Sequence, residues 1–440
     1  MTTKLKEDYT AVMREYLELS HAEKVPQEEL KSSNAYYMPH HGVVKESSST
    51  TKLRVVFDAS AKTSTGYSLN DCLMVGPKVQ EDLVNILMRF RLHPVCFSAD
   101  IAKMYRQVIL HPKDRDFHRF LWREDPTLDV QEYRMTTVTF GVASSAYHAQ
   151  RVLIKLADDE VENYPIASAI VKRDLYMDDC LSGAADLSSA MKTQQELVDM
   201  LEHGGFNLRK WSSNNVELLK ALPQELCEMN IDFDLDISQS NHVIKTLGMY
   251  LSPIKDVFLF KVRPIESLPD VYSFTKRLFL SDSSRIFDPL GLLAPVLITT
   301  KIMFQRLWLT GISWDDQLPE DLHKFWMAWR SQLTELRKLR LPRCIVPKDD
   351  KVVKHELHGF CDASESAYAA AVYIRTETVN GSISTRLVAA KTKVAPLKTL
   401  SLPRLELCGA FLLASLMKGV QAAFSFLTLF LFCWTDSLVT

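Results

Sequence analysis

Three aspartates at the ends of short apolar runs could together bind divalent metal ions. Asp178 and Asp179 lie within residues 175–181, a run that fits the tip of a tight β-hairpin because turns tolerate aspartate. Asp100 ends residues 95–100, where side-chain alternation turns it away from the apolar face. If that strand lies beside the hairpin, three carboxylates meet at one sheet edge and repel one another unless metal is bound. Mg²⁺ held by carboxylates and substrate phosphates supports phosphoryl-transfer chemistry, whereas the alternative is a solvated turn.

Alternating local patterns between residues 36 and 251 provide elements that would position these aspartates. Apolar residues that alternate with polar ones predict strands, and apolar residues spaced three or four apart predict helices. The predicted strands cover residues 42–45, 53–57, 95–100, 133–139, 169–177 and 245–251, and the predicted helices cover residues 79–91, 144–162 and 187–203. This interleaving is typical of an α+β fold with a carboxylate-bearing sheet.

The remaining parts of the chain differ in pattern. Residues 1–35 predict a helical lead-in, and residues 252–345 predict a mainly helical connector because Leu, Phe and Trp recur at helical spacing. We expect the tryptophans of the connector to lie in its core; they are Trp308, Trp314, Trp326 and Trp329. A Pro- and Lys-rich stretch marks a boundary, and residues 346–440 then show a second α/β pattern. Its expected strands cover residues 356–362, 369–375, 386–391 and 426–434, and its expected helix covers residues 403–423.

The composition is that of a globular protein. A chain of 440 residues can hold two to three domains, and 47% hydrophobic with 24% charged residues excludes global disorder. The formal net charge of −2 requires any nucleic-acid surface to be local. The eight cysteines occur singly, which favours a reducing compartment and argues against structural zinc. The start lacks a secretory signal, and the longest apolar run, residues 422–434, is too short to span a bilayer.

Five segments, in order along the chain, resemble the motifs of reverse transcriptases. Tyr-Met-Asp-Asp at residues 176–179 matches the signature Tyr-x-Asp-Asp, and Asp100 and Tyr105 have the spacing of the first catalytic motif. The other three are Thr139-Phe-Gly141-Val, Gly205-Phe-Asn-Leu-Arg-Lys-Trp211 and Leu247-Gly248-Met249-Tyr250. The sequence of these and other segments, such as Arg285-Ile-Phe-Asp-Pro-Leu-Gly, most resembles that of the Pao/BEL class of LTR retrotransposons. This resemblance covers nearly the whole chain and implies a fragment of a Pol polyprotein.

The resemblance implies a role for each candidate residue. The catalytic and metal-binding carboxylates would be Asp100, Asp178 and Asp179, with two Mg²⁺ ions as cofactors and Mn²⁺ as a substitute. The incoming triphosphate would be bound by two cations of a fingers hairpin, which are Lys45 and Arg54. Two more residues would contact the nucleotide: Tyr105, whose ring would exclude a ribose 2′-hydroxyl, and Gly141, which would allow close backbone approach. The primer grip would be Leu247, Gly248, Met249 and Tyr250.

Three carboxylates near the C-terminus resemble the first three carboxylate motifs of the ribonuclease H fold. They are Asp362 in Phe360-Cys-Asp362-Ala-Ser, Glu406 in Leu402-Pro-Arg-Leu-Glu406-Leu and Asp436 in Cys433-Trp-Thr-Asp436. The family's fourth carboxylate and final helix would follow Thr440. The resemblance therefore implies an incomplete ribonuclease H-like domain with little or no ribonuclease H activity.

Together these similarities imply an RNA-directed and DNA-directed DNA polymerase of an LTR retrotransposon. The expected fold is an α+β right-hand polymerase with fingers and palm over residues 36–251 and a helical thumb or connection over residues 252–345. An incomplete ribonuclease H-like α/β domain would follow over residues 346–440. The implied partners are an RNA template, a DNA primer and template, an RNA/DNA hybrid, dNTPs and other Pol or Gag products. No membrane is implied, and the implied location is a cytoplasmic retrotransposon particle.

Two alternatives stay open. A catalytically dead retroelement relic or a domesticated nucleic-acid-binding protein would fold without polymerising. The residues Ser144-Ser145-Ala146, where the family commonly has proline, and the early end favour that alternative. An RNA-dependent RNA polymerase is the other alternative, and Tyr105 argues against it because a bulky ring under the sugar would reject ribonucleotides.

Overall fold

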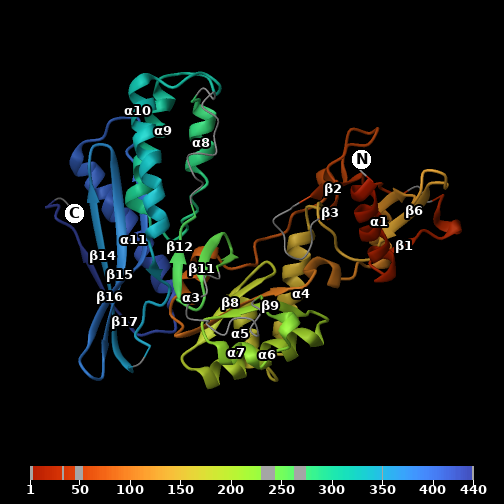
Figure 1. Cartoon of the computed structure of the whole chain (residues 1–440), viewed down its shortest axis with the longest axis horizontal. Coiled ribbons are helices and arrows are strands. Elements are labelled where there is room, and N and C mark those ends of the chain that lie inside the picture. Colours follow the sequence, from red (N-terminus) through yellow and green to blue (C-terminus); the bar gives the residue numbers. More distant parts are fainter. Residues whose placement is uncertain are drawn as a thin grey trace. The chain divides into compact units, whose positions relative to one another are not determined.

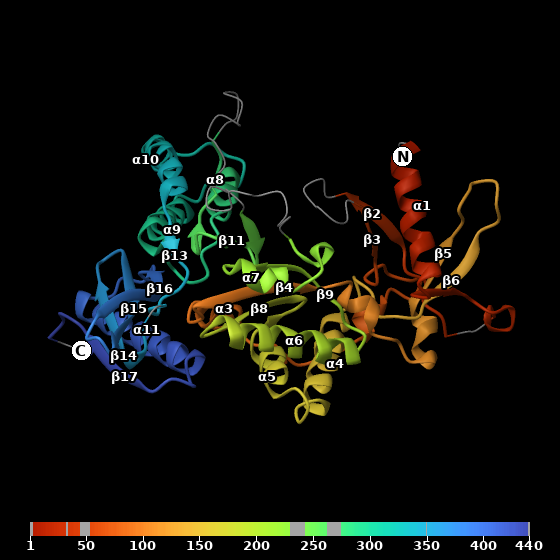
Figure 2. The ribbon, with the colours of Figure 1, turned by 60° about the horizontal axis from the view of Figure 1, so that its bottom comes forward.

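The computed structural model describes residues 3–31, 34–44, 53–228, 243–261, 274–348 and 350–438. These residues form two compact units, each made of several segments (Figures 1 and 2). Unit 1 comprises residues 1–80, 101–172 and 196–208, and unit 2 comprises residues 81–100, 173–195 and 209–440. Helices and strands are mixed in both units, which confirms the α+β expectation.

Unit 1 is built around a helix and a hairpin. Strands β2 (His40–Val44) and β3 (Leu53–Phe57) pair antiparallel, and helix α1 (Thr3–Glu18) packs beside β3, as Figure 2 shows. The helix buries one face because Tyr9, Met13 and Tyr16 recur three or four residues apart. A second sheet has the order β1-β6-β5, formed by β1 (Ala22–Lys24), β5 (Arg119–Trp122) and β6 (Gln131–Met135).

The helical lead-in predicted over residues 1–35 is wrong beyond Glu18. Ser20 has a φ of +57°, which is incompatible with a right-handed helix, and Ala22–Lys24 then pairs antiparallel with β6. After Pro26 only the short 3₁₀ turn η1 (Gln27–Glu29) follows. Pairing with a distant strand therefore overrides the local helical preference here.

Further helices and turns complete unit 1 and connect it to unit 2. They are α2 (Leu69–Cys72), η2 (Met104–Gln107), η3 (Pro112–His118), α4 (Ser145–Asp159), α5 (Pro165–Arg173) and α6 (Leu187–His203). The strand predicted over residues 169–177 is wrong for most of its length, because α5 occupies residues up to Arg173. Pro165 opens this helix, and Ala167, Ile170 and Val171 form its buried face.

Unit 2 contains the sheet that carries the predicted catalytic aspartates. Its strand order is β7-β8-β4-β9, formed by β7 (Leu175–Tyr176), β8 (Asp179–Ala184), β4 (Val95–Ile101) and β9 (Leu208–Ser213). Helix α3 (Leu83–Phe90) packs against β8. The short helix α7 (Val216–Lys220) and the turn η4 (Gln224–Leu226) follow β9.

A second sheet of unit 2 has the order β10-β11-β12-β13. Its strands are β10 (Ile244–Thr246), β11 (Met249–Ser252), β12 (Val257–Leu259) and β13 (Leu341–Pro342). The single strand predicted over residues 245–251 is instead the β10–β11 hairpin. Leu247 and Gly248 form its two-residue turn with φ values of +47° and +84°, a pair of left-handed residues that matches the twist of a hairpin.

Three helices form a separate apolar core in unit 2 (Figure 1). They are α8 (Lys276–Ser283), α9 (Ala294–Leu309) and α10 (Glu320–Gln332), and the turn η7 (Leu333–Lys338) follows. Trp326 and Trp329 are buried and stacked, as predicted. The same prediction is wrong for Trp308 and Trp314, which are 54% and 38% exposed and lie over the ammonium group of Lys276.

The C-terminal sheet has the order β16-β15-β14-β17. Its strands are β14 (Val352–Ala363), β15 (Ala367–Thr378), β16 (Ile383–Val394) and β17 (Leu429–Trp434), the last parallel to β14. Helix α11 (Leu402–Ala423) packs on β14 and β15, where Gly359 leaves room for Leu413 (Figure 1). Among the described residues α11 alone has the length and apolar composition of a membrane-crossing helix, and about a third of its apolar window is buried in the structure.

Candidate functional site

Asp178 and Asp179 lie at the tip of a tight hairpin, as the sequence predicts. Tyr176 of β7 pairs with Asp179 of β8, so Met177 and Asp178 are the two turn residues. Met177 has a φ of +55°, which is uncommon for a residue with a long side chain and stores backbone strain. The surrounding strands therefore hold this tip in a conformation that the local sequence does not favour.

Asp100 lies directly opposite Asp179 in the sheet. The two residues are partners in the antiparallel register of β4 and β8, where opposite side chains stand about 5 Å apart. Burial, followed by the charges of Asp178 and Asp100, raises the pKa of Asp179 to about 7. The three predicted catalytic carboxylates thus share one negative electrostatic environment, although the sequence places them 78 residues apart.

Two cations of β9 contact Asp100. The Arg209 Nε atom donates to Oδ1 of Asp100 at 2.9 Å, and the Lys210 Nζ atom lies 3.5 Å from Oδ2. Lys210 also lowers the pKa of Asp179, against the larger effects of burial and the two aspartates. Sequence analysis assigned no role to these cations, although both lie in the motif at residues 205–211. They compensate part of the charge that three neighbouring carboxylates create.

The aspartates fit a hard divalent cation by their chemistry. Carboxylate oxygens are the ligands that Mg²⁺ prefers, and burial together with the charges of Asp178 and Asp100 raises the pKa of Asp179, which a bound cation would counteract. Their ligand atoms do not all lie within 4.8 Å of one another. In the part of the chain that the structure describes, one acidic group meets that spacing, and it belongs to the C-terminal domain.

Three of the predicted nucleotide-binding residues, Arg54, Tyr105 and Gly141, lie in unit 1, whereas the three aspartates lie in unit 2. Arg54 is exposed on β3, opposite Val43 of β2. Lys45 lies outside the described residues. Tyr105 lies on η2, half-buried, and its ring centroid is 4.8 Å from that of Phe140 at an angle of 52°.

Gly141 is required by its own backbone surroundings. It has a φ of +95°, and a Cβ atom there would overlap the carbonyl oxygen of Phe57. The Asn70 side chain holds the same loop, donating to the Gly141 oxygen at 2.9 Å and accepting from the Ala143 amide at 2.8 Å. The close approach that the sequence suggested at Gly141 is therefore, in this structure, an approach to strand β3.

The predicted primer-grip residues form the β10–β11 turn. Met249 is buried, whereas Tyr250 is half-buried and lies beneath two ammonium groups. The Nζ atoms of Lys245 and Lys261 are 5.6 Å and 4.7 Å from the centroid of its ring. The hairpin thus combines a rigid turn with two cations that could face a phosphate backbone.

The second candidate site is the acidic cluster of Asp362, Glu406 and Asp436, whose ligand oxygens all lie within 4.8 Å of one another. Asp362 and Asp436 come to the same sheet edge because β14 and β17 are parallel neighbours, with Phe360 paired to Trp434. Glu406 is supplied by the first turns of α11. Sequence analysis singled out these three residues, and the fold brings them together.

The electrostatics of this cluster also fit a metal ion. The Oε2 atom of Glu406 is buried and has no hydrogen-bond partner among the described residues. Burial and the charges of Asp362 and Asp436 raise the pKa of Glu406. A buried carboxylate oxygen without a donor is costly unless a cation binds it.

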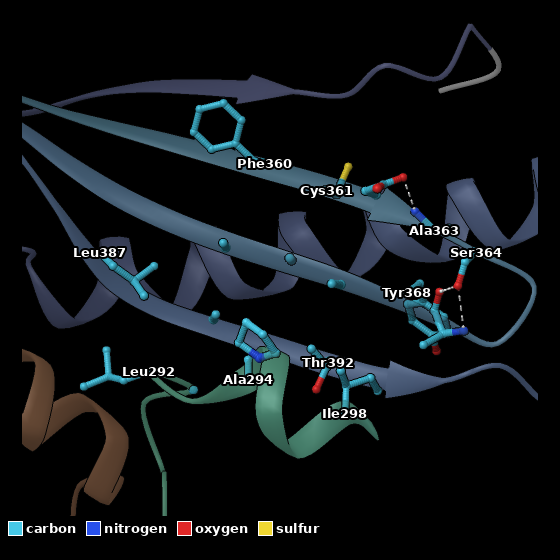
Figure 3. A pocket seen from close by; sticks show the side chains of 18 of the residues that line it. Leu292, Ala294, Ile298, Phe360, Cys361, Ala363, Ser364, Tyr368, Leu387 and Thr392 are labelled. Atoms are coloured by element: carbon cyan, nitrogen blue, oxygen red, sulfur yellow. Dashed lines mark hydrogen bonds between the residues drawn. The ribbon is translucent and has the colours of Figure 1, made fainter. Parts of the chain in front are cut away.

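A cavity of 490 Å³ lies beside Asp362, on the face of the sheet opposite α11 (Figure 3). The first turn of α9 and the segment before it form one wall, including Ala294 and Ile298. Strands β14 to β16 form the floor, which includes several alanines and has Phe360 and Leu387 at one end. Asp362 of the acidic cluster is among the residues that line the cavity.

The C-terminal part is similar to a known protein family. Residues 275–437 match the family model described as the Pao retrotransposon-like RNaseH-like domain, which confirms the resemblance over this part of the chain. The match includes helices α8 to α10, which sequence analysis placed in a separate connector. No curated protein matches the sequence.

Two solved structures share the fold of nearly the whole chain. One is a foamy viral protease-reverse transcriptase dRH in complex with double-stranded DNA, with a TM-score of 0.56 and 14% identity over 99% of this chain. The other is a foamy viral protease-reverse transcriptase in complex with an RNA/DNA hybrid, with a TM-score of 0.59 and 12% identity over 98%. The chain spans 64% and 48% of those two proteins. At such identities the likeness concerns the fold, and it confirms a reverse-transcriptase-like architecture.

Proposed function

We propose that this chain is the RNA-directed and DNA-directed DNA polymerase of an LTR retrotransposon. The observation that carries the proposal is the register of Asp100 against Asp179 at the hairpin tip, together with the pKa of Asp179 near 7. A carboxylate whose pKa is strongly raised by burial and by neighbouring charges is typical of a functional site. The fold and the C-terminal family match agree with this function.

In the proposed reaction, the primer 3′-hydroxyl attacks the α-phosphate of a dNTP. Asp100, Asp178 and Asp179 would hold two Mg²⁺ ions, whose chemistry would be to lower the pKa of the attacking hydroxyl and to neutralise the departing pyrophosphate. Lys45 and Arg54 would bind the triphosphate, and the ring of Tyr105 would lie under the sugar. The β10–β11 turn, with Lys245 and Lys261 beside Tyr250, would hold the primer backbone.

The proposed partners are an RNA template, a DNA primer and template, and RNA/DNA hybrids. The two solved relatives are described in complex with double-stranded DNA and with an RNA/DNA hybrid. This chain has a net charge of −2, so its contacts with phosphate must come from local groups of cations. Products of the same element's Gag and Pol remain proposed partners on the family resemblance alone.

The decisive experiment is primer extension in Mg²⁺ with purified protein on RNA and DNA templates. Asp178→Asn should abolish incorporation because an amide does not supply the charge that holds Mg²⁺, and Asp179→Asn should be milder. Asp58→Asn is the matched control, since Asp58 is an exposed carboxylate after β3 whose bond to the Ser60 amide asparagine can replace. Near wild-type extension by Asp178→Asn at saturating Mg²⁺ would contradict the assignment.

Sugar selection tests the role of Tyr105. The Tyr105→Val protein should still incorporate dNTPs, and its incorporation of rNTPs should rise markedly. The reason is that removing the ring opens space for the 2′-hydroxyl. The measurement is the ratio of kcat/KM for a dNTP and the matching rNTP. An unchanged ratio in a folded Tyr105→Val protein would make the residue part of the core.

The acidic cluster of the C-terminal domain is proposed to bind a divalent ion. Binding of Mn²⁺ alone, followed by electron paramagnetic resonance, should weaken at least about tenfold in Glu406→Gln. Asp350→Asn, an acidic residue outside the cluster, is the control. Equal Mn²⁺ binding by Glu406→Gln and the wild type would show that the cluster holds no metal.

The lack of proline in Ser144-Ser145-Ala146 does not support the alternative of a folded but inactive relic. Helix α4 begins at Ser145 without proline, and the Ser145 hydroxyl donates to the Thr139 oxygen at 2.6 Å. The loop before α4 is therefore held by a side-chain bond. Primer extension by the wild-type protein separates the two functions.

A further inference from the structure

Helix α1 contacts the turn that carries Tyr105. The Glu15 carboxylate bonds the Lys103 ammonium group and lies 3.1 Å from the Arg106 guanidinium. Lys103 precedes η2 and Arg106 lies within it, so the two cations flank Tyr105 in the sequence. The Glu15 carboxylate of α1 therefore contacts η2 on both sides of Tyr105.

Arg106 is the better buried of the two cations. Its side chain is only 10% exposed, its Nε atom donates to Nδ1 of His21 at 2.7 Å, and its guanidinium lies 4.2 Å from the centroid of Tyr16. Burial, then Arg106 and Lys103, lower the pKa of His21 to about 4, so its ring is neutral and accepts this bond. A buried guanidinium with such fixed partners has one favourable position, and α1 together with His21 defines that position.

The turn itself needs support. Lys103 has a φ of +51°, a strained value for a residue with a side chain. Two backbone hydrogen bonds close it: the Arg106 amide donates to the Lys103 oxygen at 2.8 Å, and the Val108 amide donates to the Tyr105 oxygen at 3.2 Å. The Tyr105 ring packs against that of Phe140, which is itself 46% exposed. The ion pairs from α1 therefore add to the packing of η2 against helix α4.

We propose that Glu15 and Arg106 are positioning residues for Tyr105, and that helix α1 thereby sets the discrimination between deoxyribonucleotides and ribonucleotides. This inference rests on the proposed polymerase function. Glu15 touches no substrate in it: the carboxylate holds Lys103 and Arg106, these hold η2, and η2 holds the ring that excludes the 2′-hydroxyl.

The first test compares Glu15→Gln with Glu18→Gln, an exposed glutamate on the same helix. Glu15→Gln should raise the kcat/KM for rNTPs about three- to tenfold, the size expected for loosening one hydrogen-bonded ion pair, and should leave dNTP incorporation within about twofold. Glu18→Gln should change neither value. Equal sugar selection in both variants would overturn the proposal.

A double-mutant cycle asks whether Glu15 acts through Tyr105. In a Tyr105→Val background, Glu15→Gln should give no further rise in rNTP use, because the ring it positions is gone. If the two substitutions instead raise the kcat/KM for rNTPs independently, so that their factors multiply in the double variant, the proposal is overturned. Arg106→Lys keeps the charge but loses the fork that reaches both Glu15 and His21, so it should behave like Glu15→Gln.

Amide hydrogen exchange provides a readout that needs no activity. Glu15→Gln should speed exchange of the Arg106 and Val108 amides at least about threefold relative to Glu18→Gln, because the turn opens more often. Unchanged exchange would show that α1 does not hold the turn. A wild-type protein that extends no primer would overturn the proposed function instead, and exchange would still decide the role of Glu15.

Discussion

Identical side chains behave differently in this molecule because their surroundings differ. Asp179 is buried beside two aspartates and has a pKa near 7, whereas Asp71 caps a short helix and its bonds to Ser68 lower its pKa. Burial acts on histidine in the opposite direction, and it lowers the pKa of His118 to about 4. At the scale of the residue, burial and neighbours decide chemistry, and both can be tested by single substitutions.

The buried histidine His118 should make stability depend on pH. Its pKa is about 6.5 when unfolded and about 4 when folded, so between these values the unfolded chain binds the extra proton. Its contribution is therefore present above pH 6.5 and is lost as the pH falls toward 4, by up to about 3 kcal/mol. Urea unfolding at pH 7 and pH 4.5 should show a smaller loss for His118→Gln than for the wild type. Exposed His41→Gln is the control, and an equal loss in all three proteins would contradict the prediction.

Gly141 should tolerate no side chain. Gly141→Ala needs a positive φ and also places a Cβ atom against the Phe57 oxygen, so we expect a loss of at least about 2 kcal/mol. Gly205→Ala is the matched control, with a φ of +75° and nothing within 4 Å, and should lose only about 1 kcal/mol. Free energies of unfolding from urea titration measure both. Similar losses in the two variants would show that the contact with β3 is unimportant.

At the scale of secondary structure, one buried pair of arginines joins several elements of unit 2. The Arg343 guanidinium, after β13, bonds Asp256 at 2.5 Å and 3.0 Å and donates to the His93 oxygen at 2.7 Å. The Arg91 guanidinium, after α3, donates to the Arg343 oxygen at 3.1 Å and to the Val388 oxygen of β16 at 2.8 Å. Helix α3, the β10–β13 sheet and the C-terminal sheet are thus tied together by backbone oxygens and one carboxylate.

Removing Arg343 should destabilise unit 2 strongly. Arg343→Ala leaves the Asp256 carboxylate, 8% exposed, with Lys348 as its remaining charged partner, and it also leaves backbone oxygens without donors. We expect a loss of about 3–5 kcal/mol in the free energy of unfolding. Exposed Arg340→Ala should change it by less than about 0.5 kcal/mol. Guanidinium unfolding followed by tryptophan fluorescence checks this, and a loss below 1 kcal/mol for Arg343→Ala would refute the structural role.

For the whole molecule, the important surface is the outer edge of the C-terminal sheet. Strand β17 ends the strand order in the described part of the chain, so one side of its backbone is unpaired. Phe430 and Trp434 are each 51% exposed, and Phe432 is 40% exposed and stacks on His358. An exposed apolar edge strand on a protein of net charge −2 favours self-association.

A charge on this edge should therefore reduce association. Phe432→Lys should lower light scattering of concentrated protein, since a lysine on an edge strand opposes pairing with another chain. Val379→Lys adds the same charge at an exposed site away from β17 and should have a smaller effect. Equal improvement by both substitutions would attribute the effect to net charge, and no improvement by either would exclude the edge as the cause.

The sequence by itself determined much of this protein because its strongest signals are local. Period-two runs predicted β3 and β4, helical spacing predicted α6 over residues 187–203, and the turn chemistry of adjacent aspartates predicted the hairpin tip. Motif order predicted that Asp362, Glu406 and Asp436 would meet, because an ordered set of motifs encodes a known arrangement of strands.

The tertiary structure decided the features that depend on contacts between residues far apart in the sequence. Residues 169–173 are helical because they have a face to bury, Asp100 is held by Arg209 and Lys210 because β9 lies beside β4, and Gly141 is needed because β3 passes beneath it. Such contacts follow from how strands and helices pack, and no local pattern in the chain records them.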